Sequence, residues 1–216
     1  MIKAVIFDCW GTLFYDDTSN AQPFVELSHR LGKNLGSDYE YLKVFEHVFM
    51  LKKCERVEVQ MHELVDKLGI KLPDEEFDYC VKILKKTTGP KKAFPEVLPK
   101  LGDLRKSYKL ALMSNCFSMG MDKLEKEFSL DHYFDTIVKS CDVGVLKPDP
   151  KMFQIVLDQL GVRKDEVLMV GNSLNDDVLA AEKFGIRAVL IDRKNMNANY
   201  LKAKILTLDE LDKFLV

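Results

Sequence analysis

Asp8 is the residue whose type and position most directly suggest chemistry. It follows the apolar run of residues 2–7 and precedes a Cys-Trp-Gly-Thr segment. A carboxylate at the tip of a buried strand can attack phosphorus or carbon and form a covalent aspartyl intermediate, and the glycine lets the chain turn there. Asp and Gly are also ordinary turn residues, so an Asp that only caps a turn is the alternative.

Three further polar segments follow in order, each at the end of an expected strand. Ser114 and Asn115 offer a hydroxyl and an amide, which suit an anionic oxygen. Lys147 precedes a rigid Pro-Asp-Pro, and a polar loop ends in Asp176 and Asp177. Taken singly, these residues could be a helix N-cap, a solvated charge and acidic first-turn residues. Together with a carboxylate nucleophile, they favour a site for a small anionic substrate.

The elements that must position these groups alternate between short apolar runs and helical stretches. A run buried on both faces is typical of parallel sheets. The expected strands are 2–7, 110–113, 136–138, 167–170, 188–191 and 205–206. Helical windows at 151–160 and 177–184 lie between them, each followed by glycine. The pattern predicts an α/β fold with a Rossmann-like, doubly wound parallel sheet.

Residues 16–90 interrupt that alternation. They hold amphipathic helical windows near 21–32, 39–53, 57–69 and 74–87, separated by Gly- and Pro-containing breaks. We therefore expect a core of residues 1–15 and 91–216, with an all-helical cap domain inserted over 16–90. The insertion leaves the core at the carboxyl end of the first strand, where open α/β sheets bind ligands, so it could act as a lid.

Composition excludes several classes of function. The 216 residues are 47% apolar and 31% charged, with a net charge of −2, so no basic field attracts nucleic acid or a membrane surface. The five cysteines include no C-x-x-C pair, which argues against a disulfide framework or a zinc site. Because there is no secretory signal and no apolar run of membrane-spanning length, the sequence predicts a cytoplasmic protein. We also expect a monomer or a homodimer.

The four segments in this order resemble the motifs of the haloacid dehalogenase-like (HAD) hydrolase superfamily. The matching residues are Asp8-x-Trp10-Gly11-Thr12, Ser114-Asn115, Lys147 in Gly-Val-Leu-Lys-Pro-Asp-Pro, and Gly171-Asn172-Ser173 through Asp177. The resemblance implies that Asp8 is the nucleophile, with Ser114 and Lys147 holding the transferred group. It also implies Mg²⁺ held by the first and fourth motifs. We expect Trp10, Thr12, Asn115 and Asn172 to contact the substrate.

Two positions depart from the pattern of the HAD phosphatases. Trp10 replaces the second Asp that serves as acid and base, and an indole cannot move that proton. Asn172 replaces the first Asp of the fourth motif, so one anionic metal ligand is moved or lost. Asp8, the Trp10 backbone carbonyl, and Asp176 or Asp177 could still hold the ion together with water.

A phosphatase acting on phosphate monoesters is the favoured interpretation, and two alternatives stay open. An aromatic residue at position 10 resembles the 2-haloacid dehalogenases, which need no metal. Their early Trp-Arg pair is absent here, and Phe153 stands where they carry a Tyr. The other alternative is a HAD-like binding protein that has lost turnover, motivated by the changes at Trp10 and Asn172.

Overall fold

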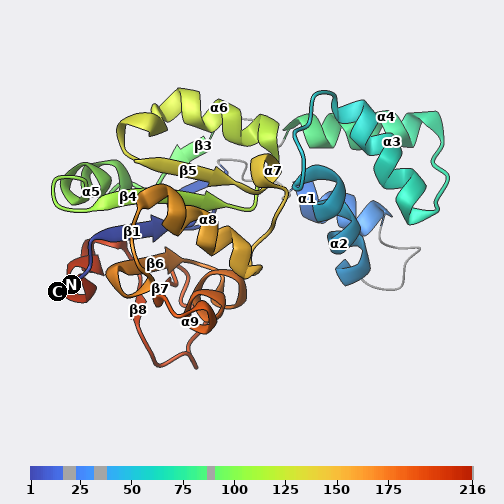
Figure 1. Ribbon diagram of the computed structural model, residues 1–216. Coiled ribbons are helices and arrows are strands. Elements are labelled where there is room, and N and C mark those ends of the chain that lie inside the picture. The colour runs from blue at the N-terminus through green and yellow to red at the C-terminus, as the bar shows by residue number, and fades with distance from the viewer. Residues whose placement is uncertain (17–22, 32–37, 87–90, 216) are drawn as a thin grey trace.

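The computed structural model describes residues 1–16, 23–31, 38–86 and 91–215. Its centre is a parallel sheet of six strands in the order β5-β4-β1-β6-β7-β8 (Figure 1). The strands are β1 (Ala4–Phe7), β4 (Lys109–Ser114), β5 (Thr136–Lys139), β6 (Val167–Gly171), β7 (Arg187–Ile191) and β8 (Lys204–Ile205). All six coincide with expected strands to within about two residues, so the predicted doubly wound sheet is confirmed.

The sheet is covered on both faces because successive side chains of a strand point to opposite sides. In β1, Val5 and Phe7 join one apolar cluster, whereas Ala4 and Ile6 join the other. The first cluster includes α5 (Val97–Leu104), α6 (Ser118–Phe128) and the C-terminal 3₁₀ helix Leu208–Phe214. The second includes α8 (Pro150–Leu160), the π-helical segment Leu174–Leu179 and α9 (Ala180–Phe184).

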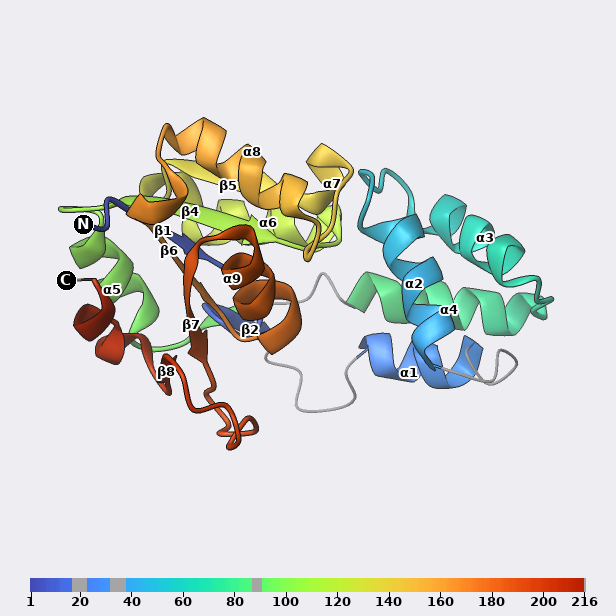
Figure 2. The same cartoon turned by 60° about the horizontal axis from the view of Figure 1, so that its bottom comes forward.

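Four helices form a separate body beside this sandwich, as Figures 1 and 2 both show. They are α1 (Pro23–Leu31), α2 (Asp38–Phe49), α3 (Val57–Leu68) and α4 (Asp74–Lys86), and each begins within about two residues of a helical window expected from sequence. Their apolar faces build a third cluster around Leu27, Tyr41 and Phe49. No helix among the described residues is long and apolar enough to span a membrane.

Two features join the helical body to the sheet. The antiparallel pair β2 (Phe14–Asp16) and β3 (Lys91–Ala93) lies where the chain leaves and re-enters the sheet domain. The second feature is a direct contact, in which Phe117 of the sheet domain packs into the helical cluster and the Cys54 backbone N–H donates to Ser118 Oγ at 2.8 Å. This contact lies beside the end of β4, at the carboxyl edge of the sheet.

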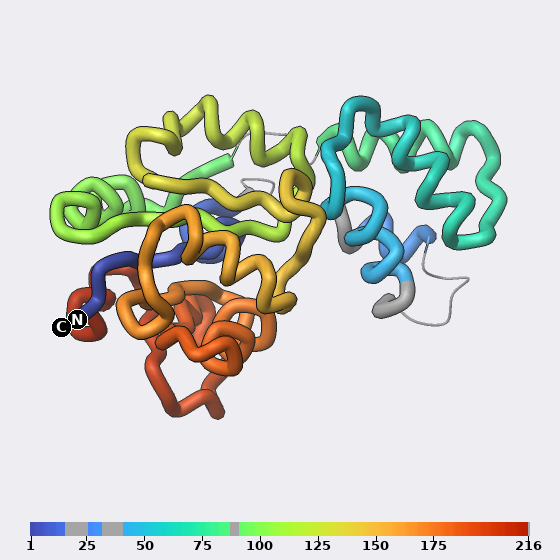
Figure 3. The backbone as a smooth tube through the Cα atoms, viewed as in Figure 1, coloured from blue at the N-terminus to red at the C-terminus, as the bar shows by residue number. Residues whose placement is uncertain are grey.

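The strand order explains why that edge can hold a ligand. After β1 the chain adds β4 and β5 on one side, and then returns to add β6, β7 and β8 on the other. At such a switch point the connections diverge and leave a crevice at the carboxyl end of the first strand. The opposite edge is closed by packing, since Ile2 lies in one cluster with Leu208 and Leu211, and the two chain ends meet there (Figure 3).

Candidate active site

Asp8, Lys147 and Asp177 meet at the carboxyl edge although they come from three distant parts of the sequence. Lys147 Nζ lies 2.6 Å from Asp8 Oδ1 and 2.6 Å from Asp177 Oδ1. All three residues are buried. One ammonium thus faces two carboxylates, which leaves the trio with a net negative charge when all are ionised.

Burial shifts the pKa values within this trio. It lowers the pKa of Lys147, but the nearby Asp177 and Asp8 carboxylates outweigh burial and hold the pKa well above the usual range. Burial also raises the pKa of Asp177 to about 6, against the opposing effect of the Lys147 ammonium. Lys147 therefore remains a cation at neutral pH, and Asp177 is the carboxylate whose ionisation is costly.

Asn115 fixes the loop that carries Lys147. The Asn115 amide donates through Nδ2 to the Lys147 carbonyl at 3.0 Å, and the Lys147 backbone N–H donates to Asn115 Oδ1 at 2.8 Å. Both ends of the side chain are engaged by the Lys147 backbone, so Asn115 positions Lys147. This pair uses one of the two Nδ2 hydrogens, and contact of Asn115 with a substrate stays a prediction. Ser114, also buried, lies one residue earlier, and its hydroxyl donates to the Asn115 carbonyl at 3.3 Å.

The Asn172 side-chain amide lies against the nucleophile loop. One end is 2.9 Å from the Trp10 carbonyl oxygen, 3.1 Å from Asp8 Oδ2 and 3.1 Å from Thr12 Oγ1. If that end is Nδ2, it donates hydrogen bonds to these oxygens. If it is Oδ1, it accepts a hydrogen bond from the Thr12 hydroxyl. Three oxygens, from Asn172, Asp8 and the Trp10 carbonyl, then lie side by side.

This second orientation bears directly on Mg²⁺. Neighbouring oxygens of a magnesium octahedron with bonds of about 2.1 Å are about 3 Å apart, and the Asn172 end lies at that spacing from both Asp8 Oδ2 and the Trp10 carbonyl. The donor set is all oxygen but carries one charge from Asp8 alone. These residues fit a magnesium ion, held more weakly than by two carboxylates.

Asp176 stands apart from this group. Its Oδ2 accepts a hydrogen bond from Ser173 Oγ at 2.9 Å. Its negative charge also acts on Glu46 of α2, whose pKa is raised first by burial and then by Asp176. Among the described residues no group of three or more His, Cys, Asp or Glu side chains is arranged to hold a metal ion. A role for Asp176 as metal ligand therefore stays a prediction.

Two glycines are required by these side chains. Gly11 has φ +79°, and a Cβ there would lie 2.5 Å from the Asn172 amide. A Cβ at Gly171 would overlap the Asp177 carboxylate. Only glycine leaves room for both groups.

Arg193 is a candidate positioning residue that the sequence analysis did not single out. Its Nε and Nη2 donate to the Thr12 carbonyl at 3.1 and 2.8 Å, and its Nη1 pairs with Glu96 at 2.7 Å. The guanidinium also lies 3.6 Å from the centre of the Phe94 ring. Arg193 follows β7 at the same edge as Asp8, so strand position was the available signal.

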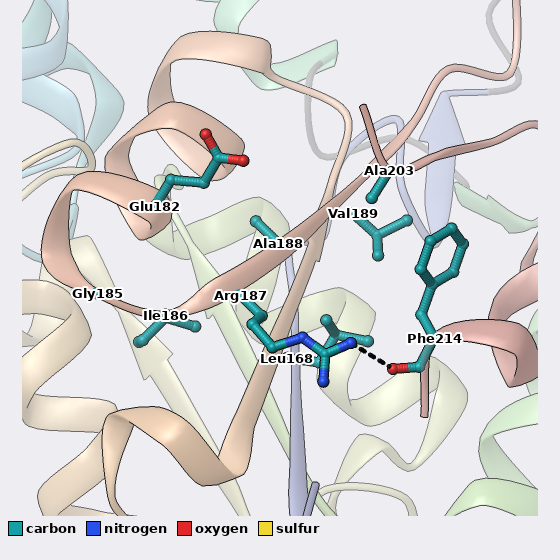
Figure 4. A pocket seen from close by; sticks show the side chains of 9 residues that line it. All are labelled: Leu168, Glu182, Gly185, Ile186, Arg187, Ala188, Val189, Ala203 and Phe214. Atoms are coloured by element: carbon teal, nitrogen blue, oxygen red, sulfur yellow. Dashed lines mark hydrogen bonds between the residues drawn. The ribbon is translucent and has the colours of Figure 1, made fainter. Parts of the chain in front are cut away.

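A cavity of about 400 Å³ lies elsewhere in the sheet domain (Figure 4). Leu168 and Arg187, at the starts of β6 and β7, line it, and Arg187 donates to the Phe214 carbonyl at 3.3 Å. The candidate active site uses the other ends of these strands. This cavity is therefore separate from the group around Asp8.

Comparison with known proteins identifies the family. Residues 2–185 match the haloacid dehalogenase-like hydrolases. The glyceraldehyde 3-phosphate phosphatase of Methanothermobacter thermautotrophicus is 27% identical, over 89% of this chain and 86% of that protein. The (S)-2-haloacid dehalogenase 4A of Burkholderia cepacia is 24% identical, over 97% and 93%. A HAD phosphatase structure from Thermococcus onnurineus superposes with a TM-score of 0.65 at 28% identity, covering 99% of this chain and 98% of that one. The chain belongs to the HAD-like hydrolases, as the motifs indicated, and it has both phosphatase and dehalogenase relatives.

Proposed function

We propose that this chain is a phosphatase that hydrolyses small phosphate monoesters through a phosphoaspartyl intermediate on Asp8. The observation that carries the proposal is the position of Lys147, whose ammonium contacts Asp8 and would face the phosphoryl oxygens of a bound ester. Without that charge, an aspartate nucleophile would repel a dianionic substrate.

Two displacements complete the reaction. Asp8 attacks phosphorus while the bond between phosphorus and the ester oxygen breaks, and the leaving oxygen takes a proton from water because Trp10 cannot supply one. Water then attacks phosphorus, and the bond between phosphorus and the Asp8 oxygen breaks. The proton released by this water neutralises the hydroxide left by the first step, so the products are inorganic phosphate and the Asp8 carboxylate. Asp177 and Asn115 keep Lys147 in place during both steps.

The proposed cofactor is Mg²⁺, held by Asp8 Oδ2, the Trp10 carbonyl and Asn172 Oδ1, with Asp177 close by. When bound, it would neutralise negative charge on the phosphoryl oxygens. In that orientation of the amide, the Thr12 hydroxyl would donate to Asn172 Oδ1 and would hold the amide oxygen beside Asp8 Oδ2 and the Trp10 carbonyl.

Hydrolysis of 2-haloacids is the second candidate function, and the other orientation of Asn172 favours it. With Nδ2 toward Asp8 Oδ2, the nucleophile is held by hydrogen bonds and needs no cation. A third possibility, ligand binding without turnover, follows from the loss of the usual acid at Trp10.

An assay of the purified protein separates the three functions. Aryl phosphates, alkyl phosphates and 2-chloro acids would be tested with Mg²⁺ and with EDTA. We expect phosphate release that requires Mg²⁺ and is fastest on aryl phosphates, whose leaving group needs no proton. Asp8→Asn should abolish it, whereas Asp158→Asn, which changes an exposed acid on α8, should not. Halide release without phosphate release would favour the dehalogenase, and no reaction would favour a binding protein.

We also propose that the cap comprises residues 16–90 and selects the leaving group, since the residues around Asp8 address only the phosphoryl group. The proposed substrate is a small anionic molecule, and neither nucleic acid nor a membrane is a proposed partner. A cytoplasmic location and a monomeric or dimeric state are proposed with it.

A further inference from the structure

The register of β4 and β5 brings two cysteines together just beyond the sheet. Ser114 of β4 is the partner of Lys139 of β5, and two residues further along each chain stand Cys116 and Cys141. Their Sγ atoms are 3.9 Å apart. The Cys116 backbone N–H donates to Ser140 Oγ at 3.0 Å, which holds the two segments together past the strand ends.

This arrangement is close to what a disulfide requires. Ser114 and Lys139, two residues before these cysteines, are partners on neighbouring strands, which lie about 4.8 Å apart. Disulfides span about 4.4–6.8 Å between Cα atoms. The sulfurs must approach by about 2 Å to reach a bond length of about 2.05 Å. We propose that Cys116 and Cys141 form a reversible disulfide when the protein meets a small peroxide oxidant, and that this bond slows the enzyme.

Cys141 is the thiol that reacts first. Hydrogen bonding from Cys116 lowers the pKa of Cys141, and the Lys139 ammonium adds to that effect, although burial and Asp142 oppose it. The pKa of Cys116 is raised by its hydrogen bond to Cys141 and by burial. Since the thiolate is the nucleophile, Cys141 is the better attacking group.

The reaction balances with one peroxide. The Cys141 thiolate attacks one oxygen of hydrogen peroxide, the O–O bond breaks, and a sulfenic acid and hydroxide form. Cys116 then attacks the oxidised sulfur, and the sulfenic oxygen leaves as hydroxide and takes up a proton. Two thiols and one peroxide give one disulfide and two waters, so two electrons pass from sulfur to oxygen.

Access favours a small oxidant over a large one. Cys116 is 1% and Cys141 4% exposed. However, Cys141 lies in the single helical turn α7 (Ser140–Val143), next to the exposed Asp142. Hydrogen peroxide is neutral and close to water in size, whereas glutathione disulfide is too large to reach these sulfurs. Cys9 is no competitor, because burial and then Asp8 raise the pKa of its thiol.

The disulfide would affect the active site because both cysteines lie close in sequence to residues that position Lys147. Cys116 directly follows Asn115, which holds the Lys147 backbone by two hydrogen bonds, and α7 leads into the loop that carries Lys147. Pulling Cys116 toward Cys141 shifts both segments and moves Lys147 relative to Asp8. The effect on rate rests on the proposed function, whereas formation of the disulfide does not.

The experiment treats the whole chain with hydrogen peroxide, blocks remaining thiols by alkylation after unfolding, and maps peptides by mass spectrometry. We expect one cross-linked peptide pair joining Cys116 to Cys141, with a mass about 2 Da below the sum of the two free-thiol peptides. Phosphatase activity should fall at least about fivefold and return with dithiothreitol. Glutathione disulfide should leave the protein reduced.

Matched variants complete the test. Cys116→Ala and Cys141→Ala should each keep their activity under peroxide, whereas Cys80→Ala, which removes a buried thiol of α4, should respond as the wild type does. If both thiols remain alkylatable after peroxide, or another pair is cross-linked, the disulfide proposal is wrong. If the disulfide forms and an active enzyme keeps its rate, the coupling to Lys147 is wrong. Peptide mapping tests disulfide formation even if the protein hydrolyses no phosphate ester. Such inactivity would count only against the proposed function.

Discussion

Asn172 combines two opposed properties at one position. Its amide lies where a metal ligand would stand, between the Trp10 carbonyl and Asp8, yet it carries no charge. In the absence of a cation, Nδ2 toward these oxygens gives hydrogen bonds, so an incoming ion must compete with them. We therefore expect Mg²⁺ to bind weakly, in the millimolar range, because a single carboxylate faces it.

Asn172→Asp tests this expectation directly. The added carboxylate should tighten Mg²⁺ binding at least tenfold, measured by calorimetry on the protein without substrate. Asn172→Ala, which removes both the ligand and the donor, should weaken binding. Equal affinities in all three proteins would show that the ion, if bound, is held elsewhere.

The ionised, buried Asp177 carboxylate should lower the free energy of unfolding at neutral pH. Its pKa is about 6 in the folded protein, against about 3.9 for an ordinary Asp, so the folded state binds this proton more tightly than the unfolded chain does. That contribution to stability is fully present below about pH 4 and is lost as the pH rises through 6. At about 1.4 kcal/mol per pKa unit, the loss at pH 7.5 is up to about 3 kcal/mol.

Asp177→Asn should thus raise the free energy of unfolding above pH 6 while removing activity. Denaturant titrations in EDTA from pH 3.5 to 8 would measure the difference between variant and wild type. We expect the gain to shrink below pH 4, where Asp177 is protonated in both states. A variant less stable than wild type at pH 7.5 would mean that the bond to Lys147 outweighs the cost of burial.

Among the residues of the site, Asp8, Lys147 and Asp177 could be identified from sequence. Parallel strands all end at one edge of the sheet, so the residues that follow them lie close together whichever way their side chains point. The structure places these three in contact. It could not be predicted that Asn115 would bind the Lys147 backbone, or that Asn172 would reach the Trp10 carbonyl. Both depend on side-chain orientation, which the spacing of residues along the chain does not determine.

Among the elements, the six core strands were predictable because each is a continuous apolar run. The pair β2 and β3 was not, since each strand has three residues and its partner lies on the far side of the helical insertion. The fourth-motif helix was expected from 177 to 184, but it begins at Leu174 with π-helical geometry. The altered turn presents Asp177 to Lys147 and leaves Asp176 on Ser173.

Arg193 joins these short elements to the nucleophile loop. It binds the Thr12 carbonyl just before β2 and contacts Phe94 and Glu96 just after β3. Arg193→Ala should lower kcat about tenfold and weaken Mg²⁺ binding, with little change in KM, because the Thr12 and Trp10 backbone would lose its support. Kinetics and calorimetry below the unfolding temperature would measure both.

Arg193→Lys is the matched variant for this position. It keeps the charge near Glu96 but lacks the fork that makes two bonds to one carbonyl, so we expect partial recovery of kcat. A purely structural arginine would change the melting temperature alone and leave kcat and Mg²⁺ affinity as in wild type.

In the whole molecule, the helical body lies beside the carboxyl edge of the sheet and contacts it through Phe117 and Cys54. Glu46 of α2 is a charged group of this body near the fourth-motif loop, since burial and then the Asp176 carboxylate raise its pKa. A carboxylate here should disfavour esters whose leaving group is itself anionic.

Glu46→Gln should therefore raise kcat/KM for phosphate esters that carry a second carboxylate or phosphate, by about threefold to tenfold. Esters with neutral leaving groups should change little, because the group around Asp8 is untouched. His47→Gln, on the exposed side of the same helix, is the control and should leave both classes unchanged. The measurement is the ratio of kcat/KM values for paired substrates that differ only in the second anionic group. An unchanged ratio in folded Glu46→Gln would mean that Glu46 does not select the leaving group.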